Sequence, residues 1–140
     1  MIYIDTSVLG AIFFRETGAE ALLERLEVSA NHGLRISAWS LTELASVGAI
    51  KQRMGHIDAL TRQHAMATFQ RFASDNLKLA EVDPADFRAA ATIIDGSNNL
   101  RSSDALHLAI ARRLGASLMT LDKRQADAAA GAGLKLAKPR

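Results

Sequence analysis

The chain contains no cysteine among its 140 residues. This absence excludes disulfide bonds, thiolate metal sites and cysteine nucleophiles, and it fits a reducing compartment. No apolar run approaches the roughly 20 residues that a membrane-spanning helix needs. The first residues also lack the basic start and long apolar stretch of a secretory signal peptide. We therefore expect a cytoplasmic protein without a membrane segment.

Neither sign of charge is in large excess. The chain has 17 Lys and Arg against 15 Asp and Glu, so the formal net charge is only +2. This balance permits contact with nucleic acid but does not require it. Hydrophobic residues make up 49% of the sequence, which is enough to build a buried core. At this length we expect a single domain that spans residues 1–140.

Short apolar runs typical of β-strands alternate with longer segments of helical periodicity. The predicted strands are 2–4, 34–39, 77–82 and 117–121, with a short fifth strand at 134–137. The predicted helices are 8–26 (broken at Gly10 and Gly18), 41–53, 59–73, 84–94, 104–114 and 125–130, and residues 95–99 form a loop. Such alternation predicts an α/β fold in which helices cover both faces of a mostly parallel sheet of about five strands.

Four acidic residues are expected at one edge of this sheet. In open α/β sheets, ligands bind beyond the carboxyl ends of the strands. Asp5 directly follows the first predicted strand, and Asp122 follows the fourth. Glu43 and Asp104 lie at the starts of predicted helices whose N-termini belong to the same edge. The sequence therefore predicts that four carboxylates converge there.

Each of these acids also has a purely structural interpretation. Asp5 is suited to cap the helix that follows it. Ser40 and Glu43 have the spacing of a capping box. Asp104 in a first helical turn is favoured by the helix dipole, and Asp122 is compatible with an ordinary turn.

Together, however, the four acids indicate chemistry. Several carboxylates at one edge repel each other, and some would have to stay protonated. A divalent cation removes this repulsion, and Mg²⁺ and Mn²⁺ prefer oxygen ligands. Such an ion activates a bound water and stabilises charge that develops on a phosphate. The pattern therefore points to metal-assisted hydrolysis of a phosphodiester.

Three segments carry a resemblance to a known family: "YIDTSVL", "SAWSLTEL" and "LRSSDALHLAIARRLGASLMTLDKR". Together they resemble the PIN domain, in particular the VapC-type toxins of bacterial toxin–antitoxin pairs, over nearly the whole chain. The resemblance implies a three-layer α/β/α sandwich and RNA cleavage that depends on Mg²⁺ or Mn²⁺. It also implies a small antitoxin partner and a homodimer.

The resemblance assigns roles to individual residues. Asp5 and Asp104 match metal ligands, Glu43 matches a ligand or a residue that orients the bound water, and Asp122 completes the acidic site. The family pattern further implies hydroxyl groups that hydrogen-bond to the ligands, at Thr6, Ser7 and Thr120.

The roles of two residues near the start of the predicted helix 104–114 remain open. Arg101 is a candidate for binding RNA or for orienting a carboxylate. His107 lies three residues after Asp104 and thus on roughly the same helix face. A packed or hydrogen-bonded histidine is the favoured interpretation of His107, and a metal ligand is the alternative.

Three other functions compete with a ribonuclease. An aspartyl-phosphate phosphatase would use Asp5 as nucleophile, but it usually has a second aspartate two residues on, where this chain has Ser7. A receiver-type signalling domain would need an acceptor after the third strand, and Asp83 there is better explained as a helix cap. The remaining alternative is a non-catalytic RNA- or protein-binding module on the same fold.

Overall fold

The computed structural model describes residues 1–97 and 99–139. Its centre is a sheet of four strands in the order β3-β2-β1-β4, and every neighbouring pair is parallel. The strands are β1 (Ile2–Ile4), β2 (Leu34–Ser37), β3 (Leu77–Ala80) and β4 (Ser117–Met119). Because parallel strands need long crossovers, helices connect them and cover the sheet.

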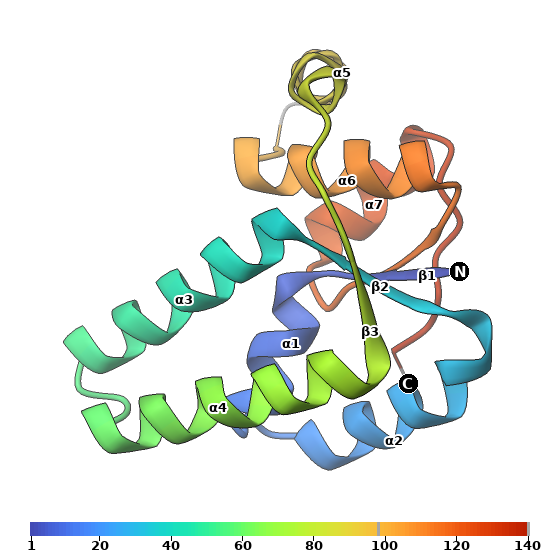
Figure 1. Cartoon of the computed structure of the whole chain (residues 1–140). Coiled ribbons are helices and arrows are strands. Elements are labelled where there is room, and N and C mark those ends of the chain that lie inside the picture. Colours follow the sequence, from blue (N-terminus) through green and yellow to red (C-terminus); the bar gives the residue numbers. More distant parts are fainter. Residues whose placement is uncertain (98, 140) are drawn as a thin grey trace.

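The helices lie in two groups on opposite sides of the sheet. They are α1 (Thr6–Phe13), α2 (Ala19–Ser29), α3 (Ala38–Arg53), α4 (Ala59–Asn76), α5 (Pro84–Asp95), α6 (Ser102–Leu114) and α7 (Lys123–Gly131), with a 3₁₀ turn η1 (Ala30–His32). Figure 1 shows α5, α6 and α7 on one side of the strands and α1, α2 and α4 on the other. The predicted three-layer α/β/α sandwich is confirmed.

Strand β1 supplies both hydrophobic cores because its side chains alternate between the two faces of the sheet. Ile2 and Ile4 belong to the core beneath α1, α2 and α4. Tyr3 faces the opposite way, into the core beneath α5 and α6. Tyr3 and Ile4 are completely buried, which fits a short strand inside a sheet that is covered on both faces.

The sheet is smaller than the sequence predicts. We expected about five strands, but the last segment is joined to β4 by a single bridge between Leu118 and Leu136. The N–H and C=O of Leu118 both bond to this segment, at 2.8 Å to Lys135 and 2.7 Å to Ala137. With one residue paired, the segment forms no strand, and the described sheet therefore has four.

Other boundaries shift for local reasons. Gly18 separates α1 from α2 as predicted, since its φ of 88° suits glycine. Gly10 was expected to interrupt the first helix but lies buried within α1. Strand β2 ends at Ser37 rather than at residue 39, and Ser37 is also the N-cap of α3. Of the predicted loop 95–99, Asp95 is the last residue of α5, and Asn98 lies outside the described residues.

None of the helices in the described part of the chain is long and apolar enough to cross a membrane.

Candidate active site

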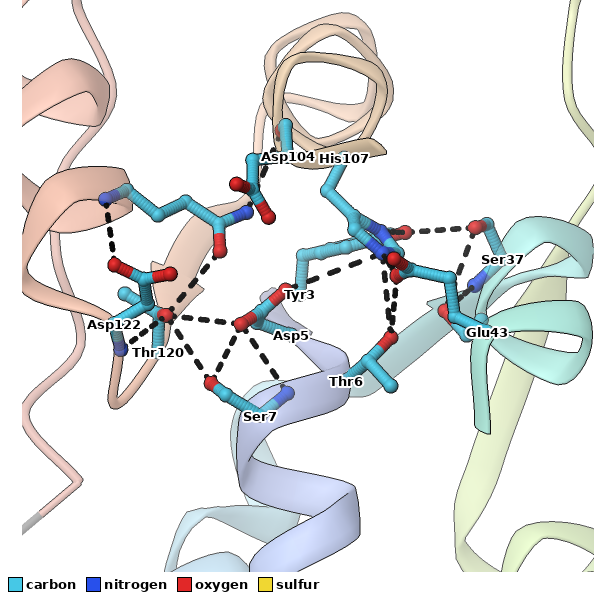
Figure 2. A network of polar contacts seen from close by, with 12 residues as sticks. Tyr3, Asp5, Thr6, Ser7, Ser37, Glu43, Asp104, His107, Thr120 and Asp122 are labelled. Atoms are coloured by element: carbon cyan, nitrogen blue, oxygen red, sulfur yellow. Dashed lines mark hydrogen bonds and ion pairs between the residues drawn. The ribbon is translucent and has the colours of Figure 1, made fainter. Parts of the chain in front are cut away.

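The predicted acids lie where the strand order reverses. From β1 the chain continues to β2 on one side, whereas β4 pairs with β1 on the other. Ligands of such folds bind beside this reversal, at the carboxyl end of the sheet, and we call this region the crevice. Figure 2 shows Asp5 in the middle, with Thr120 and Asp122 on one side and His107 and Glu43 on the other.

Asp5 is held by short hydrogen bonds at the end of β1. Its Oδ2 accepts from the Ser7 hydroxyl at 2.6 Å, from the Thr120 hydroxyl at 3.0 Å and from the Ser7 N–H at 3.3 Å. The residue is only 4% exposed. Asp5 is therefore the cap of α1, as its structural interpretation proposed, and it is also fixed in the crevice. Its other oxygen, Oδ1, lies 4.0 Å from His107 Nε2.

Gln125 is a site residue that sequence reasoning missed. It is fully buried in the first turn of α7. With its amide nitrogen directed at Asp5, Gln125 donates to Oδ2 at 2.9 Å and to Oδ1 at 3.1 Å. The available signal was its spacing of four residues from Ala129, which places both on the inward face of a helix.

Glu43 reaches the crevice from the second turn of α3. The capping box at the start of this helix belongs to Ser37 and Ser40, since the Ser37 N–H donates to Ser40 Oγ at 3.1 Å. The structural interpretation of Glu43 as part of a capping box with Ser40 is therefore wrong. Instead, Glu43 Oε1 accepts from the Thr6 hydroxyl at 2.9 Å and is hydrogen-bonded to His107 Nε2.

The charge state of Glu43 follows from these partners. Burial by itself would raise the pKa of Glu43, but hydrogen bonds from His107 and Thr6 and the charge of His107 outweigh it. The net result is that the pKa of Glu43 lies below its ordinary value. Glu43 is therefore a carboxylate at neutral pH.

His107 joins Glu43 to a buried chain of polar groups. It is completely buried, and its Nδ1 lies 2.6 Å from the Tyr3 hydroxyl. Tyr3 in turn donates to Ser37 Oγ at 2.7 Å. Burial raises the pKa of Tyr3 well above its ordinary value, so the phenol stays neutral. The hydrogen-bonded interpretation of His107 is confirmed, whereas its partners Tyr3 and Glu43 were not foreseen.

Asp104 and Asp122 share one cation, Arg101. Arg101 Nε lies 3.2 Å from Asp104 Oδ2, and Arg101 Nη2 lies 3.8 Å from Asp122 Oδ2. Asp122 also caps α7, because its Oδ1 accepts from the N–H groups of Arg124 at 2.9 Å and Gln125 at 3.4 Å. Arg101 thus contacts a carboxylate of the site, and its expected role in binding RNA or orienting a carboxylate stays a prediction.

The carboxyl group of Asp104 has a raised pKa despite this contact. Burial raises its pKa first, and the charges of Asp5 and Asp122 add to the rise. Arg101 acts in the opposite direction but does not cancel it, so the pKa of Asp104 lies above its ordinary value. A further cation in the crevice would therefore stabilise the ionised form of Asp104.

The four acids meet at one edge without touching each other. Hydroxyl groups, His107 and Arg101 stand between them, and Thr6, Ser7 and Thr120 all hydrogen-bond within the site. Among the residues that the structure describes, no group of three or more His, Cys, Asp or Glu is arranged so that it could hold a metal ion. Chemically, the donors suit a hard divalent cation, because they are carboxylate oxygens. Such a cation would also offset the negative charges of Asp5 and Asp122 near the buried Asp104.

Comparison with solved structures places the fold among known proteins. VapBC2 from Rickettsia felis, bound to a DNA fragment from its promoter, matches with a TM-score of 0.74 and 16% identity, covering 99% of this chain and 98% of the other. FitAcB from Neisseria gonorrhoeae matches with a TM-score of 0.75 and 17% identity over 99% and 98% of the two chains. VapC20 from Mycobacterium tuberculosis, a toxin that cleaves the sarcin-ricin loop, matches with a TM-score of 0.71 and 18% identity over 91% and 95%.

These identities are low, so the structural matches by themselves show a shared fold. No curated protein sequence matches the chain. The family model of the PIN domain matches residues 2–131, which include all four acids and almost all of the described structure. The chain therefore belongs to the PIN domain family.

Proposed function

We propose that the protein is a metal-dependent endoribonuclease and the toxin of a VapBC-type toxin–antitoxin pair. The observation that carries this proposal is the convergence of Asp5, Glu43, Asp104 and Asp122 at the switch point of the sheet, with an elevated pKa of Asp104. Membership of the PIN domain family supports it, and so does the fold shared with VapC20, a sarcin-ricin loop cleaving toxin.

Asp5 and Asp104 are the proposed main ligands of Mg²⁺ or Mn²⁺, with Glu43 and Asp122 completing the site. When bound, such an ion supplies an activated water and stabilises negative charge on the phosphate. Ser7, Thr120 and Gln125 fix the Asp5 carboxylate, so it does not rotate away from the crevice.

The opposite side of the crevice orients Glu43. Thr6 and His107 both bond to its Oε1, which leaves Oε2 for a ligand or for a water that attacks the phosphate. The guanidinium of Arg101 lies at the rim with a side chain that is 72% exposed, and we propose that it contacts an RNA phosphate.

We further propose that a small antitoxin of the VapB kind is the partner, that the active form is a homodimer and that the site of action is the cytoplasm. The structural neighbours include VapBC2 and a DNA-bound VapBC from Salmonella typhimurium, which supports a complex of this kind.

Cleavage by an Asp5→Asn variant tests the proposal. Asparagine remains a good helix cap, so the variant keeps the start of α1 while losing the charge. We expect RNA cleavage with Mn²⁺ to fall by more than about 100-fold, since even the residues that orient metal ligands contribute 10- to 100-fold. Asp75→Asn, on the exposed surface of α4, removes the same charge away from the crevice and serves as the control.

Two results would contradict this function. Undiminished cleavage by Asp5→Asn, with the melting temperature unchanged, would show that Asp5 is no metal ligand. RNA binding by the parent protein that survives chelation, without any cleavage, would instead support the non-catalytic binding module.

A further inference from the structure

We propose that Arg101 is the internal counter-ion of the metal-free site and that a divalent cation displaces it from Asp104 and Asp122. The inference rests on the proposed metal site and assigns this chain's own residue to its entry step.

A single guanidinium bridges carboxylates that come from different elements. Asp104 lies in the first turn of α6, whereas Asp122 follows β4 and caps α7. Arg101 approaches both through their Oδ2 atoms, at 3.2 Å and 3.8 Å. Asp104 and Asp122 are also two of the residues that would hold the proposed metal ion. Arg101 and a cation therefore compete for the same position in the crevice.

Arg101 is also the positively charged partner that is free to leave. Its side chain is 72% exposed, while the side chains of Asp104 and Asp122 are 12% and 26% exposed. An ion pair whose cationic side chain is this exposed contributes little to stability, so little is lost when the guanidinium turns into solvent. His107, which lies beside Asp5 and Glu43, is completely buried and has no such path.

Electrostatics sets the direction of the coupling. A divalent ion bonded to the same oxygens would repel a guanidinium that stayed beside it. Although Arg101 is the N-cap residue of α6, its side chain makes no capping hydrogen bond in the described structure, so its departure leaves the start of the helix unchanged. Metal binding therefore expels the guanidinium from the crevice and makes it available to the phosphate of an RNA. The cost of expelling it lowers the affinity of the site for metal.

Calorimetric titration with Mn²⁺, in the absence of RNA, tests the competition. Arg101→Gln removes the positive charge, and we expect it to bind Mn²⁺ about two- to fivefold more tightly than the parent, because the metal no longer has to break an exposed ion pair. Arg101→Lys retains the charge, so its affinity should stay close to that of the parent.

Arg112→Gln is the matched control. It removes the same charge from the same helix, but it lies about 16 Å along the helix axis from Arg101, beyond the Debye length at physiological salt. Arg112 is exposed in the last turn of α6. Its affinity for Mn²⁺ should equal that of the parent.

The outcomes separate this inference from the proposed function. The inference would be overturned if Arg101→Gln bound Mn²⁺ no more tightly than the parent. If the parent bound Mn²⁺ and Asp104→Asn did not, the proposed metal site would still stand. Equal gains from Arg101→Gln and Arg112→Gln would also overturn it, because net charge alone would then explain them. Absence of Mn²⁺ binding to both the parent and Arg101→Gln would overturn the inference together with the metal site.

Discussion

The buried chain of polar groups beneath Glu43 can be tested by removing one atom. Tyr3→Phe keeps the aromatic ring and deletes the hydroxyl that lies 2.6 Å from His107 Nδ1 and 2.7 Å from Ser37 Oγ. In this variant Ser37 Oγ loses its partner Tyr3 but keeps a contact with Ser40 Oγ at 3.5 Å. His107 is completely buried, and its Nδ1 would lose the partner that Tyr3 supplies.

The expected loss follows from this geometry. A buried polar atom that loses its partner costs about 1–3 kcal/mol. The aromatic ring still fills the core, so no cavity term is added. We therefore expect the free energy of unfolding to fall by about 1–3 kcal/mol and the melting temperature by roughly 3–10 °C for a domain of this size.

Urea denaturation at pH 7, without added metal, measures the change. Thr92→Val, which deletes an exposed hydroxyl bonded to the Arg88 carbonyl at 3.3 Å, is the control and should change stability by less than about 0.5 kcal/mol. If Tyr3→Phe were as stable as this control, the reasoning would be refuted, because the buried Tyr3–His107 contact would contribute nothing to stability.

Two further substitutions test an ion pair between α5 and α6 and a contact of Asp5 in the site. Burial acts to raise the pKa of Asp86, but hydrogen bonds from Arg113 at 2.8 and 2.9 Å outweigh it and lower the pKa. The ion pair therefore stabilises the fold at neutral pH, and this contribution is lost as the pH falls through the lowered pKa of Asp86. Arg113→Met should therefore cost about 1–3 kcal/mol at pH 7. This cost, as measured by urea denaturation, should shrink progressively as the pH falls below the ordinary pKa of an aspartate. Gln125→Leu removes two donors from Asp5 and should reduce Mn²⁺-dependent cleavage about 10- to 100-fold. Unchanged cleavage would mean that Gln125 does not orient Asp5.

The acids at the strand ends could be placed from the sequence because their positions depend on topology alone. Asp5 follows an apolar strand, and parallel pairing of β1 with β4 brings Asp5 to the same edge as the end of β4. This placement is independent of the side-chain conformations. Asp104 was placed by the same reasoning, since a helix that leads into a parallel strand begins at that edge. These placements needed no knowledge of side-chain contacts.

For Glu43 the sequence predicts the correct edge of the sheet but the wrong position within the helix. The sequence offers serines at both 37 and 40, and the spacing of Ser40 and Glu43 imitates a capping box. The choice between the two depends on where β2 stops pairing with β3, which is a long-range property. Because β2 ends at Ser37, α3 begins earlier and Glu43 moves into its second turn, where it faces Thr6 and His107.

The sequence by itself determined the alternating α/β plan, the parallel sheet and the edge at which Asp5, Glu43, Asp104 and Asp122 meet, because periodicity and chain direction are local properties. The tertiary structure decided which groups lie between those acids. These groups are Gln125 beside Asp5, Tyr3 beside His107, and Arg101 between Asp104 and Asp122. Such contacts depend on side-chain rotamers and on burial, and most of them join residues that are distant in the chain, so no local pattern encodes them.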